Sequence, residues 1–296
     1  MKIGLGTVQF GLDYGISNSQ GSTPESEVAD ILEYAWQNGI TILDTASGYG
    51  NSEEVLGRTS PANSSFDIIT KTPAFPENTI DKTDAEKLID TFRVSLNRLR
   101  QSAIYGLHFH NSGDLMKDGS QHLWEAVQSL KEDGLINKIG VSVYSPREID
   151  ILLNKYPLDL IQLPLNVFDQ RMSQEGYLKH LKELEIEIHC RSVFLQGLLL
   201  MTPDKLPDYF NSIRNMMFQY CEVLQDQDIS PLDAAMKFVS QQPEIDCVIV
   251  GVNNRSHLTE ILNVTKNIDR LTPCIDFSTY SINEEAIINP SLWRLG

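Results

Sequence analysis

The sequence predicts an α/β fold, a (β/α)8 TIM barrel that forms a single domain over residues 1–296, on three observations. Eight short apolar runs alternate with segments of helical periodicity. The runs are rich in Ile, Leu and Val without strict alternation, which is typical of parallel strands covered on both faces. No linker or low-complexity segment divides the chain, and one barrel accommodates its length. The expected strands are Lys2–Gly6, Ile40–Asp44, Asp67–Lys71, Ile104–His110, Lys138–Val143, Leu158–Leu163, Glu187–Ser192 and Cys247–Gly251.

Several of the expected helices have recognisable start signals. Thr23 is expected to cap the first helix, with Pro24 at its first position and Asn38-Gly39 at its end. The segments SPRE at Ser145–Glu148 and SPLD at Ser230–Asp233 combine a Ser-Pro start with an acid three residues after the serine. This spacing is that of a capping box, with proline at the first helical position.

One long segment interrupts the alternation of strands and helices. It runs from Leu198 to Ile229, between the seventh and eighth expected strands, and is predicted to hold a loop and an extra helix around Ile213–Leu224. The chain after Thr272 is expected to be irregular.

The composition argues against several classes of function. The net charge is −16 and Lys and Arg form no cluster, so we expect no nucleic-acid partner. No apolar run approaches the roughly 18 residues of a membrane span, and the first residues lack the apolar core of a signal peptide. The four cysteines are widely spaced, which fits reduced thiols in a cytoplasmic protein. A monomer without a metal site is expected, since no group of His, Cys, Asp and Glu has ligand spacing.

Polar side chains end three consecutive expected strands. Asp44 ends the second, Lys71 the third and His110 the fourth, while Tyr49 follows Asp44 by five residues. Because the loops after the strands build the active site of such a barrel, these four side chains are expected to meet at one rim. His108, two residues before His110, is expected to lie deeper as a core residue.

These four residue types suit proton transfer to a carbonyl group. An ammonium group beside a phenol favours the phenolate and lowers the phenol pKa from about 10, a carboxylate holds the ammonium, and an imidazole can hydrogen-bond the substrate oxygen. No side chain carries a hydride, so a nicotinamide cofactor is the expected source. Two alternatives stay open: a Schiff-base lyase with Lys71 as nucleophile, and a non-catalytic cofactor-binding sensor or subunit.

Several short motifs follow one another along the chain: LDTASGYGNSEEVLG at Leu43–Gly57, ITKT around Lys71, the histidine that ends the fourth strand, GVS at Gly140–Ser142, QLPLN at Gln162–Asn166 and LQGLL at Leu195–Leu199. With these motifs the chain resembles the aldo-keto reductase family over nearly its whole length. The opening GTVQFGLDYGISN and the final INPSLW are similar to a bacterial subgroup associated with surface-polysaccharide sugar pathways, which implies a sugar-like substrate.

The resemblance assigns roles to individual residues. It implies that Tyr49 is the general acid, that Lys71 adjusts its pKa, that Asp44 pairs with Lys71 and that His110 orients the substrate, a small carbonyl compound. It also implies that NADP(H) is the cofactor, with Arg255, Asn253 and His257 near a 2′-phosphate. The implied cofactor contacts are Gly6 and Thr7 under the ribose, Ser142 and Gln162 at the carboxamide, Ser192, Leu195, Gln196 and Gly197 along the pyrophosphate, and Gly251, Asn253, Arg255 and His257 at the adenosine end.

Two positions depart from the family pattern. Val143 stands where an asparagine usually bonds the carboxamide, and Arg191 stands where an aromatic ring usually stacks on the nicotinamide. A guanidinium can stack on a ring, but a cation disfavours an oxidised nicotinamide. Arg191 is therefore expected either to prefer the reduced cofactor or to reach an anionic substrate, and the hypothesis is that it stacks and also recognises a negative group.

The substrate itself cannot be read from the sequence, because loops set specificity. The direction of the reaction in the cell follows the cofactor ratio and is equally open. Candidate aromatic residues for the substrate pocket are Phe10, Tyr14, Phe75, Phe168 and Trp293.

Overall fold

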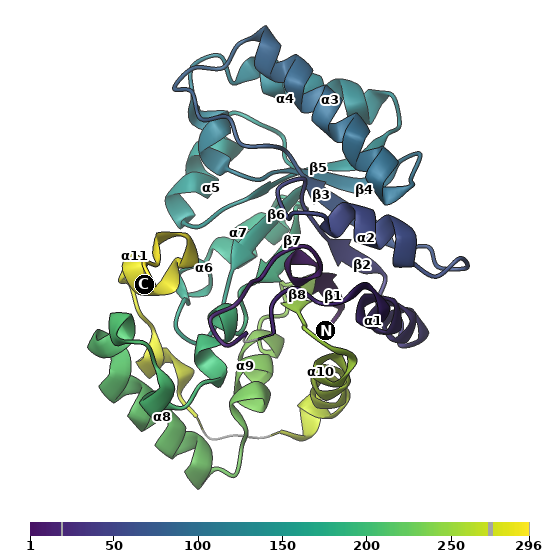
Figure 1. The fold of residues 1–296 in the computed structure, drawn as a ribbon. Coiled ribbons are helices and arrows are strands. Elements are labelled where there is room, and N and C mark those ends of the chain that lie inside the picture. Colours follow the sequence, from purple (N-terminus) through teal and green to yellow (C-terminus); the bar gives the residue numbers. More distant parts are fainter. Residues whose placement is uncertain (19, 272–274, 296) are drawn as a thin grey trace.

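Eight parallel strands close into a barrel in the order β1 to β8, and each neighbouring pair is parallel (Figure 1). The structure is a computed structural model, and it describes residues 1–18, 20–271 and 275–295. The predicted (β/α)8 barrel is thus confirmed, with strand bounds within a few residues of those expected. The strands are β1 Ile3–Gly6, β2 Ile42–Asp44, β3 Asp67–Lys71, β4 Ile104–Phe109, β5 Ile136–Ser142, β6 Leu160–Pro164, β7 Glu187–Arg191 and β8 Cys247–Gly251.

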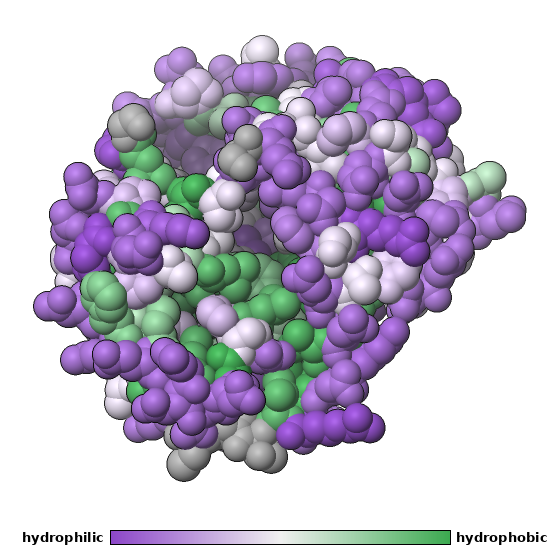
Figure 2. Space-filling view, turned by 60° about the horizontal axis from the view of Figure 1, so that its bottom comes forward, coloured by the Kyte–Doolittle hydropathy of each residue, from purple (hydrophilic) through white to green (hydrophobic). Residues whose placement is uncertain are grey.

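Helices surround the barrel (Figure 1). The outward strand residue Leu5 and the α1 residues Ile31 and Leu32 are fully buried, which shows how sheet and helix share one apolar layer. Hydrophilic residues dominate the outline of the molecule in Figure 2, and hydrophobic residues gather in its hollowed central part. The helices are α1 Glu25–Gln37, α2 Ser52–Thr59, α3 Lys82–Leu99, α4 Gln121–Glu132, α5 Pro146–Leu153, α6 Arg171–Gln174, α7 Tyr177–Glu183, α8 Arg214–Asp226, α9 Pro231–Ser240, α10 Arg255–Asn267 and α11 Glu285–Ile288.

The expected cap of the first helix is wrong. Helix α1 begins at Glu25, so Pro24 is the cap residue and Thr23 lies outside the helix. The Thr23 hydroxyl instead donates to the carbonyl of Asn253 in the loop after β8, at 3.3 Å. The Thr23 side chain, which the local pattern predicts as a helix cap, therefore makes a tertiary hydrogen bond instead.

The two Ser-Pro starts are confirmed. In α9 the Ser230 hydroxyl accepts from the Asp233 N–H at 3.0 Å, and the Ser230 N–H donates to the Asp233 carboxylate at 3.3 Å. In α5 a capping box joins Ser145 and Glu148, with Pro146 at the first helical position. Each box satisfies backbone donors that the helix itself leaves free.

The insertion between β7 and β8 holds the predicted extra helix, α8. The expected irregular tail is wrong in its described part, because short 3₁₀ turns at Phe277–Tyr280 and Pro290–Leu292 flank α11; residues 272–274 lie outside the described residues. The tail packs on the insertion: the Trp293 ring lies edge-on to Phe210, with centroids 4.9 Å apart. Within the described residues, no helix has the length and apolar character needed to cross a membrane.

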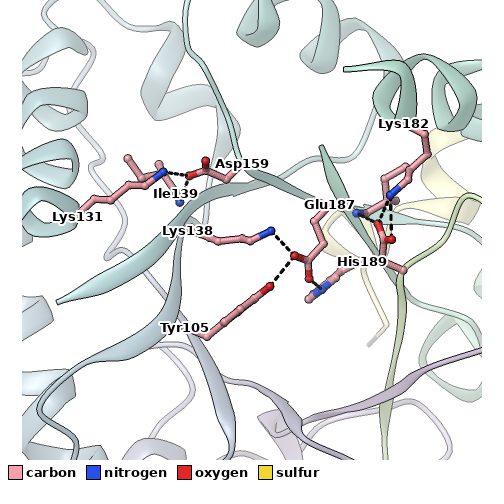
Figure 3. Close-up of polar contacts among 10 residues, drawn as sticks. Tyr105, Lys131, Lys138, Ile139, Asp159, Lys182, Glu187 and His189 are labelled. Atoms are coloured by element: carbon pink, nitrogen blue, oxygen red, sulfur yellow. Dashed lines mark hydrogen bonds and ion pairs between the residues drawn. The ribbon is translucent and has the colours of Figure 1, made fainter. Parts of the chain in front are cut away.

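A polar cluster occupies the amino-terminal end of the barrel (Figure 3). The Glu187 carboxylate accepts from the Tyr105 hydroxyl and the Lys138 ammonium, both at 2.6 Å, and lies 2.7 Å from His189 Nε2. Nearby, Asp159 and Asp246 each accept from a lysine and from the backbone N–H of a neighbouring strand. These contacts tie together β4, β5 and β7 at the end opposite the strand termini that build active sites.

Gly140 on β5 leaves room in the barrel interior for the imidazole of His108. A Cβ atom at Gly140 would lie 2.4 Å from His108 Cδ2 and 2.9 Å from the Leu160 carbonyl oxygen. We expect Gly140→Ala to lower the free energy of unfolding by about 1–3 kcal/mol, measured by urea denaturation, because overpacking forces neighbours to shift. Gly48→Ala is the control, since its Cβ would meet nothing within 4 Å; an equal loss in both variants would show that His108 does not restrict this position.

Candidate active site

A buried ion pair joins the ends of β2 and β3. The Lys71 ammonium lies 2.7 and 2.6 Å from the two Asp44 carboxylate oxygens and donates to the Thr45 carbonyl at 2.9 Å. The two side chains are only 1% and 6% exposed. Burial lowers the pKa of Lys71, and the Asp44 carboxylate opposes that shift. The three acceptors use the three ammonium protons and fix the direction of the side chain.

Tyr49 lies on the loop after β2 and faces this pair. The Lys71 ammonium is 5.1 Å from the Tyr49 ring centroid, and the His110 ring lies edge-on to Tyr49 at 5.7 Å. Among the described residues the Tyr49 hydroxyl has no hydrogen-bond partner, and the side chain lines a cavity. Burial raises the Tyr49 pKa and the Asp44 carboxylate adds to the increase. The Tyr49 pKa is therefore raised and not lowered as expected, because burial has the largest effect on it, and the phenol is protonated at neutral pH.

His110 directly follows β4. Its backbone N–H donates to the Thr72 hydroxyl at 3.2 Å. Burial, and then the charge of Lys71, lower its pKa to about 4, so the imidazole is neutral at pH 7. His108 is fully buried below it, as expected of a core residue, although neither ring nitrogen has a partner among the described residues.

A cavity of about 260 Å³ opens at the carboxyl ends of the strands. It brings together most of the predicted site, while Lys71 lies behind its wall. Among the described residues, no group of His, Cys, Asp and Glu is arranged to hold a metal ion. The predicted residues that line the cavity are Asp44, Tyr49, His110, Gly6, Thr7, Ser142, Gln162, Arg191, Ser192, Gln196, Gly197, Gly251, Asn253 and His257.

A family model for the aldo/keto reductase family matches residues 2–273. The chain belongs to the aldo/keto reductase family. It is 26% identical over 290 residues to the uncharacterized oxidoreductase YqkF of Bacillus subtilis, covering 92% of this chain and 89% of that protein. It is also 26% identical over 288 residues to the aldo-keto reductase YhdN of the same organism, covering 89% and 85%.

Solved structures of aldo-keto reductases share the fold. The holo form of AKR11C1 from Bacillus halodurans aligns with a TM-score of 0.72 at 19% identity, covering 94% of this chain and 89% of that chain. The family resemblance predicted from the motifs is confirmed, and so is the prediction of an NAD(P)H-dependent oxidoreductase. Small carbonyl compounds are the substrates that the family implies.

Two predicted cofactor contacts of this aldo/keto reductase are placed elsewhere. The Leu195 side chain is fully buried in the hydrophobic core, where an apolar group gains more than at a polar cavity. Arg255, the first residue of α10, lies over the Tyr34 ring of α1 at 4.7 Å instead of lining the cavity. Its backbone N–H donates to the Glu27 carboxylate at 2.7 Å.

Two of the cavity residues already have protein partners. The Gln162 side-chain amide donates to the Asp44 carboxylate at 2.8 Å. The Thr7 hydroxyl donates to the Asp44 carbonyl at 3.1 Å and accepts from the Ser52 hydroxyl at 2.9 Å. Both side chains thus hold the end of β2 in place, and Gln162 would have to exchange a partner to bind a carboxamide.

The loops after β1 and β7 meet beside the cavity. The Ile16 N–H donates to the Gln196 carbonyl at 3.2 Å, and a Cβ atom at Gly197 would lie 2.2 Å from the Ser17 hydroxyl. Ser192, Leu195, Gln196 and Gly197 all have positive φ, between 47° and 94°, so this loop is tightly coiled. The glycine is required where the two loops approach most closely.

Of the five aromatic candidates for the substrate pocket, Tyr14 alone lines the cavity. Phe10, Phe75 and Phe168 are at most 2% exposed and belong to the core, and Trp293 packs on the insertion. Sequence reasoning missed Tyr144, which lies two residues after Ser142 on the same strand-end loop and lines the cavity. Tyr144 could have been predicted from its position in the sequence, because it lies two residues after the predicted cofactor contact Ser142.

The two departures from the family pattern contact each other. The Val143 carbonyl accepts from Arg191 Nη2 at 3.0 Å, while the Val143 side chain is fully buried. The guanidinium of Arg191 also lies over the Tyr144 ring at 4.2 Å. The sequence identified Val143 and Arg191 as unusual but did not indicate that they contact each other.

The depressed pKa of His110 predicts a pH dependence of stability. An unfolded histidine has a pKa of about 6.5, so between pH 6.5 and about 4 the unfolded chain binds a proton that folded His110 does not. Stability is therefore lost as the pH falls through this window, by up to about 1.4 kcal/mol per pH unit for this group. Urea unfolding of the wild type and of His110→Asn at several pH values measures the contribution of His110 to the pH dependence of stability. If the free energy of unfolding changed equally with pH in both proteins, His110 would have an ordinary pKa.

Proposed function

We propose that this protein reduces an aldehyde or ketone, sugar-like in character, to an alcohol with NADPH, and that Tyr49 donates the proton. One observation carries the proposal: the Tyr49 hydroxyl, free of protein partners among the described residues, faces the cavity beside the Asp44–Lys71 pair and the neutral His110. The phenols of Tyr14, Tyr49 and Tyr144 line one cavity and support a substrate rich in hydroxyl groups.

The cavity fits a nicotinamide cofactor. Gly6 and Gly251 line it where β1 and β8 pair, and the side-chain amide of Gln9 packs against Gly251, so backbone and an amide border the cavity at that point. Asn253 and His257 line it at the amino-terminal end of α10, where backbone N–H groups and the helix dipole favour phosphate. When bound, the nicotinamide supplies the hydride, and Ser142 and Gln162 would hold its carboxamide.

The protein residues control the proton. Tyr49 gives its hydroxyl proton to the carbonyl oxygen as negative charge develops there. The Lys71 ammonium, held by Asp44 and Thr45, stabilises the phenolate that remains. The neutral His110 imidazole can orient the carbonyl by a hydrogen bond without adding a charge.

The geometry does not favour the Schiff-base alternative. Lys71 would need to be a free amine with room for a carbonyl carbon, whereas its ammonium is buried and its three protons are directed at Asp44 and Thr45. Borohydride with a bound carbonyl compound is expected to leave Lys71 unmodified, as measured by mass spectrometry.

The direct test is a titration of the purified protein with NADPH and with NADH, followed by assays on a panel of aldehydes and ketoses. Tight NADPH binding and oxidation of NADPH by members of the panel are the expected results. Binding without turnover of any carbonyl compound would support the sensor alternative, and the absence of binding would rule out both.

Cofactor choice depends on two charges at the start of α10. Arg255 lies there with its guanidinium on Tyr34, and the Glu27 carboxylate accepts the Arg255 N–H. A 2′-phosphate near this end would be attracted by Arg255 and repelled by Glu27. We expect Arg255→Gln to weaken NADPH binding about tenfold with little change for NADH, and Glu27→Gln to strengthen NADPH binding several-fold. Fluorescence titration measures both; parallel changes for NADPH and NADH would contradict the assignment.

A further inference from the structure

Arg191 is the only lysine or arginine that lines the cavity, and among the described residues it has no carboxylate partner. Asp44 is the only acidic residue in the lining, and its charge is already neutralised by Lys71. The cavity therefore carries one uncompensated positive charge in a protein whose net charge is −16. A charge held in this way is costly, so a function for it is expected.

The guanidinium is held in one position. Nη2 donates to the Val143 carbonyl at 3.0 Å, Nη1 donates to the Ser192 hydroxyl at 3.2 Å, and the Tyr144 ring lies under the guanidinium at 4.2 Å. Nε is buried and has no partner among the described residues. The two hydrogen bonds and the Tyr144 ring fix the guanidinium, so its positive charge keeps one position beside the cavity.

The positive charge of Arg191 affects the pKa values of Tyr49 and His110. It opposes the burial that raises the Tyr49 pKa, and it adds to the burial that lowers the His110 pKa. Arg191 also lies near the predicted carboxamide contacts, since Gln162 on β6 pairs with Ser142 on β5 and with His189, two residues before Arg191 on β7.

We propose that Arg191 makes the site bind the reduced nicotinamide cofactor in preference to the oxidised one. This rests on the proposed function, because it needs the nicotinamide to bind beside Ser142 and Gln162. A reduced nicotinamide bound there would supply a hydride to the carbonyl carbon, and the Tyr49 hydroxyl would give its proton to the carbonyl oxygen. The oxidised ring then has one more positive charge, which the guanidinium repels.

The test is equilibrium binding of NADPH and NADP⁺ to the wild type, Arg191→Gln and Arg191→Lys, with folding checked by thermal melting. In the wild type, NADPH is expected to bind more tightly than NADP⁺. In Arg191→Gln the ratio of the two dissociation constants should fall at least about tenfold, mainly through tighter NADP⁺ binding. Arg191→Lys keeps the charge and should keep most of the ratio. Arg255→Gln is the matched control, since a phosphate contact changes both affinities in parallel.

An unchanged ratio in Arg191→Gln would overturn the proposal, and so would an equal weakening of both ligands, which would indicate a phosphate contact. Absence of binding to the folded wild type would instead remove the proposed function itself. If Arg191→Gln does not fold, the wild type can be tested with 2′-phospho-ADP-ribose, which lacks the nicotinamide. This compound is expected to bind the wild type more tightly than NADP⁺ does. Weaker binding of that compound would contradict the repulsion.

Discussion

Replacement of Tyr49 by phenylalanine is expected to lower kcat/KM for carbonyl reduction by about 10²–10⁴-fold, while the dissociation constant of NADPH stays within a few-fold of the wild type. The hydroxyl has no protein partner among the described residues, so its loss removes the proton donor without opening a hydrogen bond of the fold. Steady-state kinetics with a good substrate from the panel and fluorescence titration of NADPH provide the two measurements.

Tyr14→Phe is the matched control, because Tyr14 is a second phenol that lines the same cavity. Burial, followed by the effect of Tyr49, raises the pKa of Tyr14 to about 12, and Gln196 hydrogen-bonds its side chain. A loss below tenfold is expected in this variant. If the two variants lost activity equally, Tyr49 could not be assigned as the only donor.

Replacement of Lys71 by methionine is expected to lower the free energy of unfolding by about 3–5 kcal/mol and to abolish measurable turnover. The substitution leaves the Asp44 carboxylate buried with only the Gln162 amide and no cation beside it. Urea denaturation at pH 7 measures the stability, and the same samples serve for kinetics.

The double variant Asp44→Asn with Lys71→Met separates the two effects. It removes both charges, so most of the lost stability should return while turnover stays absent. A double variant as unstable as Lys71→Met alone would show that the lost stability comes from the packing of the lysine stem and not from the unpaired carboxylate.

The sequence alone was sufficient to predict the barrel and the meeting of four polar side chains at one rim. Strands buried on both faces have a strong compositional signal, and residues that end such strands must meet at one rim, so Asp44, Lys71 and His110 were predictable together with Tyr49. The capping boxes of α5 and α9 are local, and for that reason they were also predictable.

Several expectations that the structure does not meet depend on distant neighbours. The Thr23 hydroxyl donates to the Asn253 carbonyl, more than two hundred positions away in the chain, and does not cap the helix. The Arg255 side chain lies over Tyr34 and the Leu195 side chain lies in the core, while their cofactor contacts stay predictions. The phenol pKa was predicted to fall because the effect of Lys71 was considered without the burial of Tyr49 and the charge of Asp44, both of which raise that pKa.

The polar cluster around Glu187 bears on how this barrel can change over generations. Its contacts join β4, β5 and β7 at one end of the barrel, whereas the cavity residues Tyr14 and Tyr144 lie on loops at the opposite end. Mutations that alter the preferred substrate therefore fall on segments that contribute little to holding these strands together. An ancestor with this arrangement could exchange one carbonyl compound for another without passing through poorly folded intermediates.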